Sequence, residues 1–223
     1  MNRLPRSTKP QPGPLEPGAT QRPVTYKSGS LCGYKQDPRL LEARQRAVII
    51  AGRPGSGKDI CANYLQGFLE NVQVVNLGDI VRNQVARSGN VTRSLLQRKS
   101  IELRKKFGAD VIAASAIRTV DKSKRYVVFV GIRDITEVRR VQKMFDTTVI
   151  AVYAPPKVRY TRLMERSRLD DTKDLKKLVA RDADEDKWSR IDAVMEEADI
   201  RLDNSGSLAL FKRRVKEVAR SLR

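Results

Sequence analysis

The chain has 223 residues, which is long enough for one full-size domain with a core and too short for two large ones. Its 45 Lys and Arg against 26 Asp and Glu give a net charge of +19, so an anionic partner is expected. The absence of His removes the commonest general base and the commonest zinc ligand. Cys32 and Cys61 form neither a disulfide framework nor a metal-type spacing, and no apolar stretch approaches the roughly 18 to 20 residues that cross a bilayer. We therefore expect a soluble cytoplasmic protein in a reducing compartment, with no membrane partner.

Residues 1–44 contain most of the prolines, in stretches such as "KPQPGPLEPGATQRP", and show no sustained apolar period. Eight Lys and Arg against three Asp and Glu give this segment a charge of +5 and leave +14 for the rest. It is predicted to be a disordered basic extension, and its prolines argue against the amphipathic helix of a transit peptide. The domain is then expected over residues 45–223.

From residue 46, short β-rich runs alternate with helical segments. Strands are predicted at 46–51, 72–77, 126–132, 147–154 and 198–204, and helices at 58–70, 79–87, 92–107, 109–120, 134–145, 156–167, 173–195 and 207–222. The first, third and fourth strands are nearly continuous apolar runs, which is typical of strands buried on both faces of a parallel sheet. The order predicts an α/β fold: a three-layer α/β/α sandwich around a mostly parallel five-stranded sheet.

The stretch "GRPGSGKD" at 52–59 follows the first predicted strand and precedes a predicted helix. Gly52, Gly57 and Lys58 satisfy the G-x-x-x-x-G-K pattern, whose glycines let main-chain N–H groups face a phosphate while the lysine reaches the outer phosphates. The alternative is a plain glycine turn. The residues predicted to bind ATP here are Gly52, Arg53, Pro54, Gly55, Ser56, Gly57, Lys58, Asp59 and Ile60.

Asp59 departs from the pattern, because Ser or Thr in that place normally ligates Mg²⁺ through its hydroxyl. A carboxylate can serve the metal directly or through water, and it also puts a negative charge close to the β-phosphate. Asp59 is therefore the predicted metal residue. A site that binds nucleotide with impaired turnover is the alternative.

Together with the phosphate loop, "GDIVR" at 78–82 and "GIR" at 131–133 resemble the nucleoside monophosphate kinases. That resemblance implies that Asp79, Arg82 and Arg133 line the acceptor site, within an acceptor-binding region of about 79–120. Guanidinium groups that follow strand ends suit this role, because they are planar donors for phosphate oxygens at the edge of the sheet where ligands bind.

The run "PKVRYTRLMERSRLDD" at 156–171 resembles the short lid of the same kinases, and the lid is expected over about 162–190. The resemblance implies that Arg162 stacks on adenine. It implies that Arg166, Arg168 and Arg181 clamp the transferring phosphoryl group, and with Lys58 these are the predicted catalytic residues. An ordinary basic surface helix is the alternative.

The stretch "ADIRLDNSGSLALFKRRV" at 198–215 resembles the terminal strand, loop and helix of dephospho-CoA kinases. The resemblance implies that the turn containing Asn204 and Gly206 packs against the nucleotide base, and Ser207 is also a candidate N-cap. "VVFVGIRDITEV" and "RLDDTKDLKKLVARD" resemble an archaeal group of adenylate-kinase-like P-loop proteins. Such relatives usually carry Asp in place of Val130, where it helps to hold Mg²⁺.

The predicted function is transfer of the ATP γ-phosphoryl group, with Mg²⁺, to a small nucleotide-type acceptor, either dephospho-CoA or a nucleoside monophosphate. This chemistry needs positioning and charge neutralisation more than a strong base, which suits a chain rich in arginine without His. The alternative is an RNA-associated P-loop ATPase, based on the basic extension and the basic last helix. Trp188 is interpreted as a packing residue near the lid, and the oligomeric state is not predicted.

Overall fold

The computed structural model describes residues 25–26, 45–86, 91–166 and 172–223. Within these ranges, five strands run parallel: β2 (Arg46–Ala51), β3 (Val72–Asn76), β4 (Tyr126–Val130), β5 (Asp146–Tyr153) and β6 (Ile200–Asp203). A short strand β1 (Thr25–Tyr26) pairs antiparallel with the outer edge of β6, giving the order β1-β6-β5-β2-β4-β3. The predicted mostly parallel five-stranded sheet is confirmed, and β1 is an addition from the segment expected to be disordered. Apart from β1, residues 1–44 lie outside the described residues, so the disordered extension and the domain boundary at residue 45 stay predictions.

The sheet is central because its strands are apolar on both faces. All five residues of β4 are buried, and β2 between β4 and β5 is buried from its second residue onward. Alternate residues of β2 face opposite layers: Ile49 belongs to one core cluster and Ile50 to the other. The continuous apolar runs in the sequence therefore reflect burial on both faces, as predicted.

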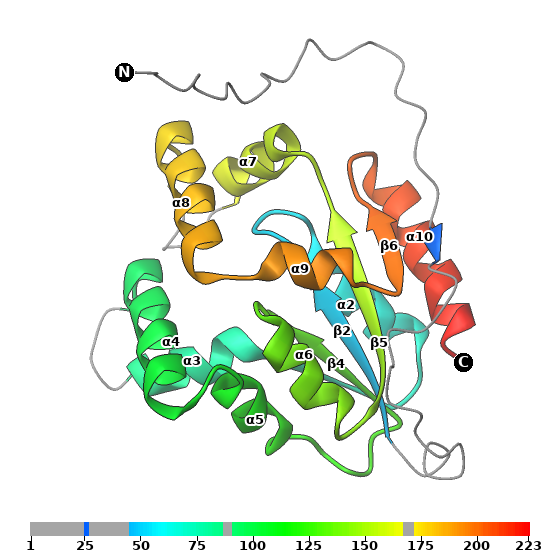
Figure 1. Ribbon diagram of the computed structural model, residues 1–223. Coiled ribbons are helices and arrows are strands. Elements are labelled where there is room, and N and C mark those ends of the chain that lie inside the picture. The colour runs from blue at the N-terminus through cyan, green and yellow to red at the C-terminus, as the bar shows by residue number, and fades with distance from the viewer. Residues whose placement is uncertain (1–24, 27–44, 87–90, 167–171) are drawn as a thin grey trace, which may run out of the picture.

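Helices cover both faces and complete the three layers (Figure 1). On one face pack α2 (Lys58–Phe68) and α10 (Leu208–Ser221), and on the other α5 (Val111–Ile117), α6 (Ile135–Gln142) and α9 (Ile191–Glu196). The helices α3 (Leu77–Val85) and α4 (Arg93–Phe107) lie beside α5, whereas α7 (Pro156–Glu165) and α8 (Leu175–Trp188) lie beyond the carboxyl ends of the strands. Both groups frame the edge of the sheet where the phosphate loop lies.

The single helix predicted over 173–195 is wrong, because the structure divides it into α8 and α9. The break is at Ser189, whose backbone is extended. Its hydroxyl donates to the carbonyl of Arg133 at 3.1 Å and accepts from the N–H of Ile191 at 3.2 Å. The N–H of Arg190 also donates to the Arg133 carbonyl, at 2.9 Å. These bonds to the loop after β4 outcompete continuation of the helix, and the helical period of the sequence could not reveal them.

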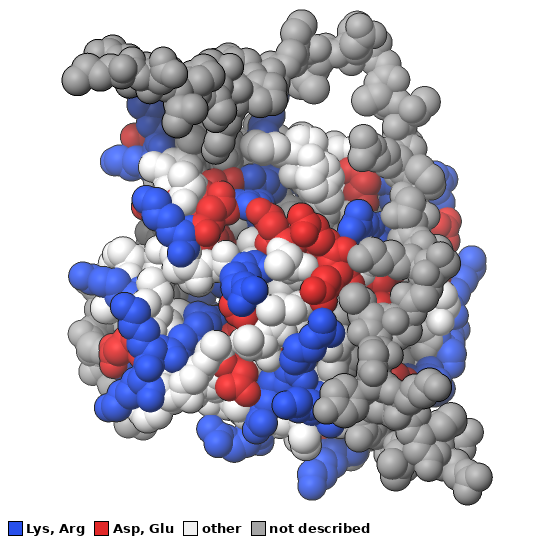
Figure 2. All heavy atoms as spheres, viewed as in Figure 1, with Lys and Arg blue, Asp and Glu red and all other residues white. Residues whose placement is uncertain are grey.

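The high positive charge is unevenly spread. Figure 2 shows acidic side chains gathered over α9 and the α8–α9 bend, with Lys and Arg over α4, α5 and α6. The exposed carboxylates of α8 and α9 include those of Asp186, Asp192 and Glu196. In the part of the chain that the structure describes, no helix has the length and apolarity needed to span a bilayer.

Candidate active site

The loop between β2 and α2 has a backbone shape that depends on glycine. Gly55 has φ +79° and Gly57 has φ +96°, which is the left-handed region. A Cβ on Gly57 would lie 2.1 Å from Asn204 Nδ2, and one on Gly55 would lie 2.6 Å from the carbonyl oxygen of Arg159. The loop thereby presents the start of α2, whose first N–H groups have no partner within the helix. This is the arrangement that binds phosphate groups.

Two side chains hold this phosphate loop, residues 52–59, from outside. Asn204, which is almost fully buried, donates through Nδ2 to the carbonyl of Ser56 at 2.8 Å. Arg159 donates through Nη1 to the carbonyl of Pro54 at 3.0 Å. Both contacts reach the loop from elements far along the chain, so its shape is fixed by the fold as well as by its glycines.

The loop opens onto a cavity of about 600 Å³, bounded by the start of α3, the first half of α4, the end of β4 and α8. Of the residues predicted to be functional, those that line it are Pro54, Lys58, Asp59, Arg82, Arg133, Arg166 and Arg181. The structure thus brings together side chains that the sequence spreads over more than a hundred residues.

Positive charges crowd this cavity. Burial lowers the pKa of Lys58 to about 8, and although Asp59 counteracts this, the charges of Arg133, Arg93 and Arg166 lower it further. Burial likewise lowers the pKa of Arg133 to about 10, with Arg93 contributing. Cations whose protonated forms are disfavoured in this way would be stabilised by an anion, so the cavity is suited to a polyanionic ligand.

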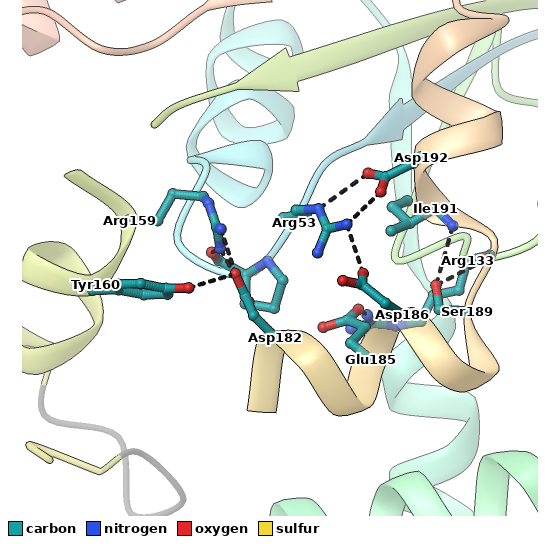
Figure 3. A network of polar contacts seen from close by, with 11 residues as sticks. Arg53, Arg133, Arg159, Tyr160, Asp182, Glu185, Asp186, Ser189, Ile191 and Asp192 are labelled. Atoms are coloured by element: carbon teal, nitrogen blue, oxygen red, sulfur yellow. Dashed lines mark hydrogen bonds and ion pairs between the residues drawn. The ribbon is translucent and has the colours of Figure 1, made fainter. Parts of the chain in front are cut away.

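Arg133 is fixed in place on several sides. Its guanidinium pairs with Glu185 of α8 (Figure 3). It also lies over the ring of Trp188, 5.4 Å from the ring centre. Its backbone N–H donates to Glu137 at 2.8 Å, and this fully buried carboxylate pairs with Arg104 of α4 at 2.7 Å. Desolvation raises the pKa of Glu137. Arg133 therefore connects the loop after β4 with α6 and α8, and through Glu137 with α4, at one point on the cavity wall.

The other acceptor residues differ in placement. Arg82 lines the cavity and pairs with Asp79 one turn earlier on α3. Asp79 is exposed and is not among the described residues that line the cavity. A direct acceptor contact by Asp79 stays a prediction, and its observed contact is with Arg82.

Several predicted nucleotide residues lie elsewhere. The side chain of Arg53 contacts Asp186 and Asp192 and lines a second cavity of about 390 Å³ rather than the first. Arg162 is half-buried on α7, and among the described residues its Nη1 has no hydrogen-bond partner. Gly52 is buried at the end of β2, while Ile60, in the first turn of α2, and Gly206 are exposed.

The turn before α10 contains two residues for which the sequence predicts a role, Asn204 and Ser207. Ser207 is the N-cap of α10 and accepts from the N–H of Leu210 at 3.3 Å, as its sequence position allows. Asn204 donates to the main chain of the phosphate loop. Its contact with a nucleotide base stays a prediction. Arg168 lies outside the described residues.

Asp59 is the cavity-lining carboxylate next to Lys58, while Val130 at the end of β4 is buried and offers no ligand. Within the described residues, no group of three or more Cys, Asp or Glu side chains is arranged to hold a metal ion. Mg²⁺ usually takes one or two carboxylates and completes its shell with water and substrate phosphates. A single carboxylate beside a phosphate loop fits that requirement.

Some cavity residues were not singled out from the sequence as contacts. They come from α4 and α8: Thr92, Arg93, Gln97, Ser100, Asp184, Glu185 and Trp188. No residue of α4 is fully buried, and Leu96 lines the cavity beside these polar side chains. Trp188 was interpreted as a packing residue; it packs on Arg133 and also forms part of the wall. That Trp188 is the single tryptophan of the chain is the sequence feature that could have indicated it as a site residue.

Fold and loop together define a P-loop kinase-like protein. A family model described as "AAA domain" matches residues 51–179. Among solved structures, a Thermus thermophilus protein has a TM-score of 0.55 at 20% identity, and shikimate kinase from Bacteroides thetaiotaomicron has 0.53 at 12%. Each match covers 81% of this chain and 99% of the other. At these identities the likeness establishes the fold.

The sequence relatives narrow this class. A UPF0200 protein of Saccharolobus islandicus is 33% identical over 176 residues, covering 78% of this chain and 92% of its own length. A UPF0200/UPF0201 protein of Archaeoglobus fulgidus is 35% identical over 179 residues, and this chain spans 54% of its length. The chain belongs to the AAA domain family of P-loop proteins and to the UPF0200 group. The predicted resemblance to archaeal P-loop kinase-like proteins is confirmed.

Proposed function

We propose that this protein is an ATP-dependent phosphotransferase that moves the γ-phosphoryl group to a small nucleotide-type acceptor, dephospho-CoA or a nucleoside monophosphate. The observation that carries the proposal is the continuity of the phosphate loop with the cavity of about 600 Å³. Lys58 lies where the two meet, and arginines from α3, α4, α7's end and α8 line the wall. A cytoplasmic location goes with this proposal.

Each part of the cavity then has a role. Lys58 supports the β- and γ-phosphates, Arg82 and Arg133 bind the acceptor, and Arg166 with Arg181 neutralises the group in transfer. In this proposal residues 79–120 bind the acceptor, and residues 162–190 form a lid that excludes water from the reacting phosphate. Arg168 would join the lid arginines.

The proposal includes Mg²⁺ held by Asp59 with the nucleotide phosphates. When bound, the metal ion supplies positive charge that neutralises the phosphate oxygens. The carboxylate of Asp59 would take over the duty of the acidic residue that Val130 replaces. A strong general base is not required for this transfer, which agrees with a chain that has no His.

The size of the cavity favours a small acceptor. Pockets for small molecules typically measure about 300 to 1,000 Å³, and this cavity lies within that range. Its hydroxyl and amide groups, from Thr92, Ser100 and Gln97, offer hydrogen bonds beside the arginines. A polar, anionic compound fits these walls better than an apolar one.

The test is a panel of acceptors with ATP and Mg²⁺, followed by determination of where the product carries its new phosphate. We expect ADP release that depends on one acceptor class and is lost in Lys58→Ala. Arg139→Met is the matched control, because Arg139 makes an exposed ion pair with Glu197 away from the cavity. Tight ATP binding without product from any acceptor would instead identify a nucleotide-binding protein with impaired turnover.

An RNA-associated P-loop ATPase is the second candidate, and the exposed face of α10 favours it. Lys212, Arg213, Lys216 and Arg220 are all exposed on this helix, whereas Arg214 is buried against Asp203. A salt-dependent RNA complex that survives Lys58→Ala, with ATP hydrolysis stimulated by RNA, would favour this candidate over the kinase.

A further inference from the structure

The helix α8 contributes one face to the main cavity. Arg181, Asp184, Glu185 and Trp188 line it, at the spacing of successive turns. Leu178 is the one apolar residue of α8 that is fully buried, whereas Leu175 and Val179 are about half exposed. A helix with so little apolar anchorage needs other contacts to stay over the cavity.

Those contacts are ionic, and Figure 3 shows them together. Asp182 accepts from Arg159 of α7 at 3.2 Å and from the hydroxyl of Tyr160 at 2.9 Å. Arg53 of the phosphate loop donates to Asp186 of α8 at 2.6 Å and, through Nε, to Asp192 of α9 at 3.0 Å. The carboxylates of Asp182 and Asp186 thus point toward α7 and the phosphate loop, while Arg181 is on the cavity side.

The ionic contacts of α8 differ in burial, and the pair of Glu185 with Arg133 is largely buried, at 5% and 25% exposed. The side chains of Arg159 and Asp182 are 4% and 14% exposed, and Arg159 also holds the carbonyl of Pro54, so this pair is part of the permanent structure. Arg53 is 18% exposed, but its partners Asp186 and Asp192 are 52% and 59% exposed. The Arg53 contacts are therefore the ones that solvent can weaken.

We propose that Arg53 is a positioning residue, which docks α8 on the phosphate loop through Asp186 and the adjoining α9 through Asp192, and so keeps Arg181 at the cavity. The importance of Arg181 rests on the proposed function, while the docking itself does not. The geometry supports this role over phosphate binding by the Arg53 side chain, because both carboxylates occupy its guanidinium and it lies outside the main cavity. Asp192 and Asp186 also raise the pKa of Arg53, although its burial opposes them.

The test compares Arg53→Met, the double variant Asp186→Asn with Asp192→Asn, and all three changes combined. In the full chain without ligand, we expect backbone amides of α8 to exchange about three to ten times faster in each variant. The combined variant should exchange no faster, because all the changes remove the same contacts. Arg53→Lys, which keeps the charge, should restore most of the protection, and Arg139→Met serves as the control.

Activity gives the second measurement. Loss of docking should lower kcat while KM for ATP changes by less than about twofold, and the two aspartate changes should do the same as Arg53→Met. If Arg53→Met does not fold, the unmodified chain supplies the test: α8 exchange should speed up as NaCl is raised from about 0.1 to about 1 M.

Two outcomes would overturn the proposal. One is α8 exchange in Arg53→Met that matches Arg139→Met. The other is a loss of ATP affinity in Arg53→Met about tenfold beyond that in the double aspartate variant, which would make Arg53 a phosphate ligand. Failure to find any acceptor would count against the proposed function alone, since exchange is measured without ligand or turnover.

Discussion

Replacing Gly57 with Ala tests whether the phosphate loop depends on its left-handed glycine. At φ +96° an L-residue is strained by about 1 to 2 kcal/mol. The new Cβ would also lie 2.1 Å from Asn204 Nδ2, so the buried amide must move and lose its bond to the Ser56 carbonyl. Leaving such groups unpaired costs about 1 to 3 kcal/mol. We therefore expect Gly57→Ala to lower the free energy of unfolding by about 2 to 5 kcal/mol.

Gly67→Ala is the matched control on the same helix. Gly67 is exposed within α2, and nothing lies within 4 Å of the Cβ it would gain. Removing a helical glycine should raise stability by about 0.5 to 1 kcal/mol. Thermal unfolding should place Tm about 5 to 15 °C below the unmodified chain for Gly57→Ala, and slightly above it for Gly67→Ala. Equal stability of the two variants would refute the argument from the loop's geometry.

Four further predictions concern three residues of the cavity. Burial lowers the pKa of Lys58 to about 8, so this side chain loses its positive charge between pH 7 and pH 9. ATP affinity should therefore fall about tenfold over that range, and calorimetry should show no such fall for Lys58→Met. The sign for ligand-free stability is opposite: folding favours neutral Lys58, so chemical unfolding should show stability rising between the folded pKa near 8 and the unfolded value of 10.5. Trp188, the chain's single tryptophan, should change its fluorescence when a productive acceptor binds; turnover of an acceptor without such a change would contradict its place in the wall. Asp59→Ala should raise the Mg²⁺ concentration required for turnover about tenfold or more, and an unaltered requirement would exclude Asp59 as the metal residue.

The sheet and the phosphate loop could be predicted because their signals are local. Apolar runs at 46–51 and 126–130 became buried parallel strands, and the glycine spacing before Lys58 became a loop with positive φ. Both follow from rules about neighbouring residues. The alternation of strands and helices along the chain, which the structure confirms, also predicted the edge of the sheet at which the site lies.

The partners of charged residues could not be predicted in the same way. Arg53 contacts Asp192, 139 positions away, and Arg133 contacts Glu185, and no sequence period specifies such pairs. The prediction of one continuous helix through Ser189 is wrong for the same reason, because the Ser189 hydroxyl donates to the distant carbonyl of Arg133. Contacts between remote segments decide which arginines face the cavity.

The short strand β1 has a consequence for the behaviour of the whole molecule. Its antiparallel pairing with β6, Thr25 opposite Arg201, satisfies backbone groups along one margin of the sheet. A chain shortened to begin at residue 45 would leave that margin open, and open strand edges recruit strands from other molecules. Shortened protein should therefore self-associate at lower concentration than the full chain, so the pairing of β1 with β6 would lower the tendency to aggregate.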